Sequence, residues 1–191
     1  MPATSPVNVL RLPATGRTEA SRRTTEIERV VVGLFEQFRA PLLRYTLSLG
    51  LSVHDGEEIT QEVFLALFQH LQLGKSRQNL RGWIFRVAHN LALKRRYAKQ
   101  RLHGEDQRDG HSAETQLDSS PNPEEQVLAA QRQQRLLAAL DNLPEQDRAC
   151  LRLRAEGLRY REIARVLGIS LGGVSISLTR SLARLMCADE G

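Results

Sequence analysis

Apolar residues recur every three or four positions through most of this chain, which is the spacing of helices that bury one face. The run Ile59, Val63, Leu67 and Leu71 shows the pattern clearly. The same spacing predicts helices over residues 25–38, 41–51, 53–73, 80–101, 126–144, 145–157, 158–168 and 170–186. No segment convincingly alternates apolar and polar residues as a half-buried strand does. The pattern therefore predicts an all-α fold.

Two stretches without periodicity divide the chain. Residues 1–23 are rich in Pro, Thr, Ser, Ala and Arg, and they predict a disordered tail. Residues 104–125 hold few apolar residues and several turn formers, and they predict an acidic linker. We therefore expect two small helical bundles, at 24–103 and 126–187, joined by a flexible linker. Within the first bundle, Pro41 is expected to end or kink the first helix.

Composition narrows the class of protein. The 191 residues include 27 Lys and Arg against 22 Asp and Glu, and the pI of about 9.8 weakly indicates a polyanionic partner. Cys150 and Cys187 lie in apolar helical patterns and are expected to be small buried hydrophobes. No apolar run approaches the roughly 20 residues of a membrane span, so we expect a cytoplasmic protein with no membrane partner. Without a phosphate-binding glycine loop, an HExxH motif or a nucleophile–base set, we expect no enzyme, no metal and no cofactor.

The helix predicted from Leu80 changes character along its length. At about 100° per residue, its apolar positions fall on one side, which should pack on the first bundle. A second set falls within about 80° on the adjoining side. This set, here called the basic strip, consists of Trp83, Arg86, Asn90, Lys94, Tyr97 and Arg101.

The charge around the basic strip favours a nucleic-acid surface. No Asp or Glu occurs from Val63 to His103, whereas nine Lys and Arg do. A helix face that is merely solvated usually mixes both signs, so a face kept for solubility is the weaker interpretation. Aromatic rings between cations offer stacking platforms for unpaired bases. Tyr97 suits that role, whereas Trp83 fits either a platform or the core at the helix start.

The helix at 53–73 opens with an acidic group that has two interpretations. Asp55, Glu57, Glu58 and Glu62 lie in its first half. Carboxylates near a helix N-terminus are stabilised by the helix dipole, which alone could account for them. Because Gln61 extends the same polar surface, a docking face for a basic partner protein is the other interpretation.

Residues 158–186 have the spacing of a helix-turn-helix. Gly168 would supply the turn, Ile169 would lie between the two helices, and Ser170 would cap the second one. Two apolar stripes should face inward: Tyr160, Ile163, Ala164 and Leu167, then Leu171, Val174, Leu178 and Leu185. A plain helical hairpin of the core remains the alternative interpretation.

Three blocks together resemble the sigma-70 family of bacterial RNA polymerase sigma factors, in its compact extracytoplasmic-function (ECF) class. DGEEITQEVFLALFQHL is similar to the family's polymerase-docking helix, and LRGWIFRVAHNLALKRRYAKQR to its promoter-melting and −10-recognition helix. LDNLPEQDRACLRLRAEGLRYREIARVLGIS resembles its −35-binding domain. The resemblance covers about residues 28–186, and its specificity lies in the order and spacing of the three blocks.

The resemblance implies binding residues in both bundles. Core RNA polymerase would dock on Asp55, Glu58, Gln61 and Glu62. The single-stranded −10 element would bind Trp83, Arg86, Asn90, Lys94, Arg95, Arg96, Tyr97 and Arg101, of which Arg95 and Arg96 lie off the basic strip. The duplex −35 element would bind Arg159, Arg161, Ser170, Gly172, Gly173, Ser175, Ile176, Thr179 and Arg180.

The chain also departs from the family pattern. Ser175, Ile176 and Ser177 stand where the family usually carries cationic and polar groups, which favours reading of the −35 duplex by its shape. Lys94 stands where the family often has Asp, which strengthens the basic strip.

The resemblance further implies an anti-sigma factor as a partner, and a path for the linker through the RNA channel of the polymerase. The alternative interpretation of the acidic linker is a soluble spacer between the two bundles. The alternative to a sigma factor is a stand-alone helix-turn-helix regulator, although such a protein gives no reason for a cationic helix with interleaved aromatic rings.

Overall fold

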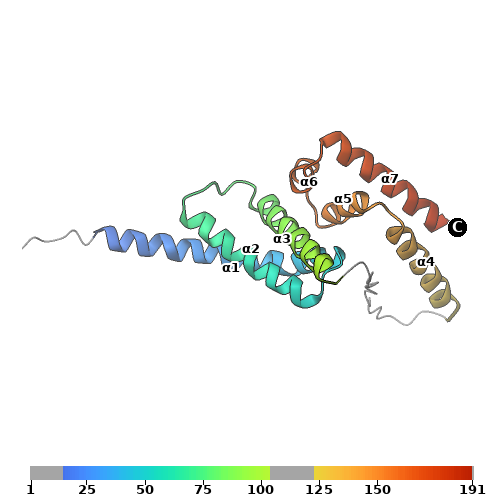
Figure 1. Cartoon of the computed structure of the whole chain (residues 1–191), viewed down its shortest axis with the longest axis horizontal. Helices are drawn as coiled ribbons and strands as arrows, with labels where there is room; N and C mark the ends of the chain where they lie inside the picture. The colour runs from blue at the N-terminus through green and yellow to red at the C-terminus, as the bar shows by residue number, and fades with distance from the viewer. Residues whose placement is uncertain (1–14, 104–122, 191) are drawn as a thin grey trace, which may run out of the picture.

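A computed structural model describes residues 15–103 and 123–190, and every element in these ranges is helical (Figure 1). The helices are α1 (Thr15–Ser48), α2 (Val53–Gln72), α3 (Leu80–His103), α4 (Pro123–Asp141), α5 (Glu145–Ala155), α6 (Tyr160–Leu167) and α7 (Leu171–Glu190). The predicted all-α class is confirmed. Most of the predicted acidic linker, residues 104–122, lies outside the described ranges. Its last residues, 123–125, begin α4.

The first bundle contains α1, α2 and α3, and its first helix differs from the prediction. α1 begins at Thr15, inside the stretch expected to be a disordered tail, and runs unbroken through Pro41. Phe38 and Leu42 on either side of Pro41 are both buried, so packing holds the helix together where proline removes a backbone donor. α1 therefore does not end at Pro41, and the helix expected to begin there is the second half of α1.

α2 packs along α1 at close range. Its start is fixed by a capping box, in which the Ser52 side chain accepts a hydrogen bond from the Asp55 N–H and the Asp55 side chain accepts one from the Ser52 N–H. Gly56 follows one turn into the helix. A Cβ at this position would lie 2.7 Å from the Thr46 hydroxyl oxygen, so the absence of a side chain lets α2 approach α1.

The second bundle contains α4 to α7, with the predicted helix-turn-helix at α6 and α7. Gly168 ends α6 in the left-handed conformation at φ 68°, and the Ser170 hydroxyl accepts a hydrogen bond from the Gly173 N–H at 3.0 Å, as predicted. Tyr160 and Leu171 were expected to face inward, but both are exposed because each lies at the first position of its helix. Cys150 is buried as expected, whereas Cys187 near the chain end is exposed.

The two bundles contact each other directly. α3 lies against α6 and α1 touches α5. The buried side chains of both bundles form one continuous cluster. Phe85 of α3 and Leu158 just before α6 are both fully buried members of it.

Among the described residues, no single helix is long and apolar enough to cross a membrane. The pair α6 and α7 meets the criterion together by length and composition alone, with a bend of 104° between the two helices.

Candidate nucleic-acid interface and docking face

The basic strip lies on the solvent-facing side of α3. Arg86, Asn90, Lys94 and Arg101 are exposed, and Tyr97 is 58% exposed. The opposite side, with Ile84, Ala88 and other apolar residues, is buried in the core. The helical period therefore separates the two faces as the sequence predicts, and the strip is open to a ligand.

Trp83, at the start of the basic strip, is half-buried rather than free. Its ring lies 4.8 Å from the ring of His70, centroid to centroid. His70 is held in turn by a 3.1 Å hydrogen bond between its Nε2 and the Ser76 carbonyl, in the loop before α3. Trp83 thus packs at the rim of the core with part of its surface exposed.

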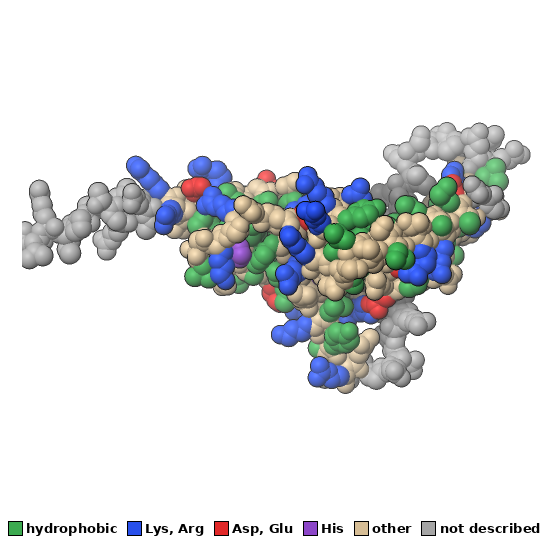
Figure 2. Space-filling model, turned by 90° about the horizontal axis from the view of Figure 1, so that it is seen from above, with side chains coloured by type: hydrophobic (Ala, Val, Ile, Leu, Met, Phe, Trp, Pro, Cys, Tyr) green, Lys and Arg blue, Asp and Glu red, His purple; other side chains and the backbone are tan. Residues whose placement is uncertain are grey.

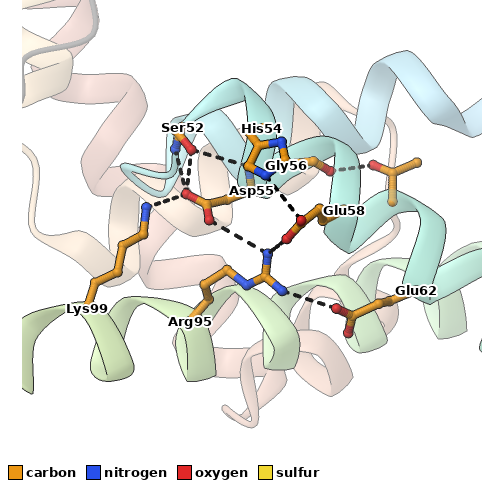
Figure 3. A network of polar contacts seen from close by, with 9 residues as sticks. Ser52, His54, Asp55, Gly56, Glu58, Glu62, Arg95 and Lys99 are labelled. Carbon is orange, nitrogen blue, oxygen red and sulfur yellow. Dashed lines mark hydrogen bonds and ion pairs between the residues drawn. The ribbon is translucent and has the colours of Figure 1, made fainter. Parts of the chain in front are cut away.

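Several cations of α3 that lie off the basic strip pair with carboxylates of other helices. Arg95 points toward α2 and pairs with three of its carboxylates (Figure 3). It binds Glu58 directly, its Nη2 lies 3.1 Å from a Glu62 oxygen, and its Nη1 lies 3.6 Å from an Asp55 oxygen. The hydrogen bond that Arg95 donates to Glu58 raises the pKa of Arg95 further. Arg95 is therefore occupied within the chain.

Asp55 is the most buried carboxylate of this α2–α3 network. It accepts hydrogen bonds from Lys99 and Ser52 in addition to its contact with Arg95 (Figure 3). Burial opposes its ionisation, but the hydrogen bonds from Lys99 and Ser52 outweigh that effect and lower the pKa of Asp55. Asp55 thus serves chiefly to join α2 to α3, and it offers little surface to a partner.

The rest of the acidic face of α2 is accessible. The side chains of Glu58 and Glu62 are 44% and 49% exposed, and Gln61 is exposed beside them. A basic partner that approaches this face would meet two carboxylates already shared with Arg95. Both interpretations of the acidic group thus have support, because the residues stabilise the bundle and also face solvent.

Arg96, on the other flank of α3, pairs with Glu145 at the start of α5. This contact joins the two bundles, and no helical period in the sequence could predict it. Arg95 and Arg96 were assigned to the −10 element by resemblance, and that assignment stays a prediction for two side chains that are paired in this structure.

Most of the residues assigned to the −35 element are exposed on the helix-turn-helix. The exposed members are Arg159, Arg161, Ser170, Gly172, Ser175, Ile176 and Thr179, whereas Gly173 is half-buried. Ile176 is 64% exposed, so an apolar side chain occupies the outward side of the first turns of α7. The Arg159 backbone N–H donates to the Glu162 carboxylate at 2.7 Å, which fixes the start of α6.

Arg180 differs from the other residues assigned to the −35 element, because its side chain is paired within the chain. Its guanidinium donates two hydrogen bonds to Asp147 of α5, at 2.6 and 2.7 Å, and the Asp147 side chain is fully buried. The hydrogen bonds from Arg180 lower the pKa of Asp147. The side chain of Arg180 therefore holds α7 on α5, and its assignment to the −35 element stays a prediction for a side chain that is paired in this structure.

One face of the molecule shows an excess of positively charged side chains (Figure 2). On the face shown in Figure 2, Lys and Arg side chains clearly outnumber Asp and Glu side chains. An excess of cations on one face is expected to attract a polyanion.

Comparisons with known proteins agree with this arrangement. A family model of sigma-70 region 2 matches residues 34–102, and a model of sigma-70 region 4 matches residues 133–185. The chain is 30% identical over 185 residues to the ECF RNA polymerase sigma factor SigE of Mycolicibacterium smegmatis, covering 96% of this chain and 68% of that protein. It is 26% identical over 167 residues to the ECF RNA polymerase sigma-E factor of Escherichia coli K12, covering 81% and 87% of the two chains.

The chain belongs to the ECF class of sigma-70 family RNA polymerase sigma factors.

Two solved structures share the fold of this sigma factor. One is the sigma factor RpoE of Bartonella quintana in complex with the anti-sigma factor NepR, with a TM-score of 0.63 and 17% identity over 82% of this chain and 94% of that one. The other is CnrH in complex with the cytosolic domain of CnrY, with a TM-score of 0.57 and 21% identity over 90% and 94%.

Membership of the family confirms the predicted function. The protein is a sigma factor that directs RNA polymerase to promoters, with region 2 in the first bundle and region 4 in the second.

The contacts that sequence patterns missed are those between distant segments of the sigma factor. Asp147 and Glu145 are polar residues in the first turn of α5, where the helix dipole alone would explain them. Their partners, Arg180 and Arg96, lie 33 and 49 residues away. No local signal identifies such pairs.

Proposed function

We propose that the two bundles divide promoter recognition between them, with the opened −10 element on the first and the −35 duplex on the second. The observation that carries this proposal is the solvent-facing basic strip, in which cations and aromatic rings alternate along one side of α3. Cations bind phosphates regardless of sequence, and an exposed ring can stack on a base only where the strands are separated.

In the −10 complex, Arg86, Lys94 and Arg101 would bind successive phosphates of the single strand. Tyr97, between the last two, would stack on a base, and Asn90 would supply a hydrogen bond. Trp83 would contact DNA with the part of its ring that His70 leaves exposed.

Core polymerase would dock on the exposed carboxylates of α2, chiefly Glu58 and Glu62, with Gln61 beside them. Asp55 would support this face from within, since its carboxylate is held by Lys99 and Ser52. The proposed role of the sigma factor is recruitment and promoter opening without catalysis of its own, in the cytoplasm. An anti-sigma factor, like the NepR bound to RpoE of Bartonella quintana, would be its regulator.

In the second bundle, Arg159 and Arg161 would bind the backbone of the −35 duplex, and the first turns of α7 would enter its major groove. The outward residues there are small or apolar, so the −35 element would be read largely by its shape.

The test is run-off transcription by bacterial core polymerase with this protein over a randomised promoter library. The wild-type chain should select two sequence elements and produce transcripts. Lys94→Gln with Arg101→Gln should keep polymerase binding but reduce the salt dependence of single-strand binding, by about 0.7 in the logarithmic slope for each lost phosphate contact. Arg22→Gln with Arg39→Gln is the control, because it removes two exposed cations from α1, a different helix from the one that carries the strip.

Two results would contradict the proposal. The first is an unchanged rate of promoter opening in the strip variant. The second is strong, specific binding of duplex promoter without polymerase, which would favour the stand-alone regulator.

A further inference from the structure

The first half of α7, the second helix of the helix-turn-helix, carries no charged side chain. From Leu171 to Thr179 the exposed hydroxyl groups are those of Ser175 and Thr179. Ser177 is buried, and its hydroxyl accepts a 3.4 Å hydrogen bond from Gln146 of α5. These turns therefore offer a major groove no guanidinium, ammonium or side-chain amide, the groups that read guanine and adenine by paired hydrogen bonds.

Ile176 is the largest exposed side chain in the middle of this segment. Val174 and Leu178, two positions before and after it, are buried in the bundle. Residues two positions apart lie on nearly opposite sides of a helix, so these two anchors turn Ile176 outward. A partner that covers Ile176 with apolar atoms would remove its methyl groups from water, which stabilises the contact.

The turn before Ile176 leaves room for such a partner. Helical side chains lean toward the N-terminus of the helix, so Ile176 lies over Gly172 and Gly173. A Cβ at Gly172 would meet the Ser170 hydroxyl oxygen at 3.9 Å and nothing closer, so packing within the described chain does not require glycine there. Glycine destabilises a helix relative to alanine, but it lets another molecule approach the backbone closely.

We propose that Ile176 recognises one thymine of the −35 duplex through the C5-methyl group of that base. Thymine is the base that presents a methyl group in the major groove, and apolar side chains recognise it by contact. The first turns of a recognition helix are the part that reaches base edges, and Ile176 lies in the first two turns of α7. This inference rests on the proposed function of the second bundle, and it adds one direct base contact to a duplex otherwise read by its shape.

Replacement of thymine by deoxyuridine tests the contact, because the two differ only by the methyl group. The full chain with core polymerase would first select its −35 element from a randomised promoter library. Each thymine of that element, on either strand, would then be replaced in turn by deoxyuridine. At one position we expect the wild-type holoenzyme to bind the uracil promoter about fourfold less tightly, the value of one buried methyl group.

Protein variants assign this ratio of affinities to Ile176. Ile176→Ala should bring the ratio close to one, whereas Ile176→Val keeps a branched apolar side chain and should keep most of it. Arg161→Gln is the matched control, because loss of a proposed backbone contact should weaken binding to both promoters equally and leave the ratio unchanged. Since Ile176 is largely exposed, Ile176→Ala should unfold at the same temperature as the wild type.

Three results would overturn the inference and leave the proposed function intact. The first is a −35 element without thymine, or a ratio near one at every thymine. The second is the same ratio in the wild type and in Ile176→Ala, which would mean that the methyl group acts through the shape of the DNA. The third is an unchanged ratio with weaker assembly of the holoenzyme, which would assign Ile176 to a protein contact. If the library yielded no −35 element at all, the proposed function of the second bundle would fail, and this inference with it.

Discussion

Arg180→Ala would remove both hydrogen bonds that α7 donates to the buried Asp147 carboxylate. Removing one partner of a buried pair generally costs about 3–5 kcal/mol, because the other charge is left in a poorly solvated site. The Arg180 side chain is 48% exposed, so solvent screens the pair and the expected cost is smaller. We expect a loss of about 2–3 kcal/mol in the free energy of unfolding of the second bundle, in line with hydrogen bonds to charged groups.

The measurement is urea denaturation together with native-state hydrogen exchange of the amides in α5 and α7. Arg184→Ala is the matched control, since it removes an exposed cation one turn later on the same helix and should change stability by less than about 0.5 kcal/mol. In an Asp147→Asn background, Arg180→Ala should cost less, because the buried charge is already absent.

The pH dependence has a defined sign. The hydrogen bonds from Arg180 lower the pKa of Asp147 below that of the unfolded chain, where Asp titrates near about 3.9. The stability difference between wild type and Arg180→Ala should therefore be full above that pH and should shrink as pH falls through the lowered pKa. If Arg180→Ala unfolded like the wild type but lost −35 duplex binding, Arg180 would be a DNA contact and the structural argument would be wrong.

Three further predictions concern single positions. Burial lowers the pKa of His89, whose ring shares a 2.9 Å hydrogen bond with Tyr45, so the free energy of unfolding should fall as pH drops below about 6.5. His89→Gln should reduce the difference in this free energy between urea titrations at pH 7.5 and at pH 5.5. The same difference in the wild type and the variant would contradict the prediction. Ser52→Ala removes the side-chain cap of α2 and should lower the free energy of unfolding, measured by thermal denaturation, by about 1 kcal/mol. An unchanged stability would mean that Asp55 alone fixes the start of the helix. Gly168→Ala should cost about 1 kcal/mol from the left-handed backbone alone, because a Cβ there meets nothing within 4 Å; an unchanged melting temperature would refute this.

The ion pairs of Arg95 limit how much of the positive charge of α3 is available to DNA. The sequence shows a long acid-free segment, and its cations all look available. In the folded chain, the acidic start of α2 lies beside the cationic end of α3, so Arg95 and Lys99 are paired (Figure 3). The exposed cations Arg86, Lys94 and Arg101 are thus the stronger candidates for phosphate binding.

Local patterns determined the helices other than α1, the exposed basic strip, the turn at Gly168 and the cap at Ser170. Each of these depends on residues within one or two turns of each other, where the helical period or a single backbone conformation decides the outcome. The family also followed from local blocks of sequence, in their order along the chain.

Only the tertiary structure decided which charges are paired and which surfaces are covered. Arg95 and Glu58 are 37 residues apart, Arg96 and Glu145 are 49 apart, and Arg44 and Glu156 are 112 apart. Such pairs form because apolar faces bury against each other and bring distant helices together, and the direction of each helix in the bundle then selects the partners. The continuation of α1 through Pro41 has the same origin, because burial of Phe38 and Leu42 outweighs the tendency of proline to end a helix.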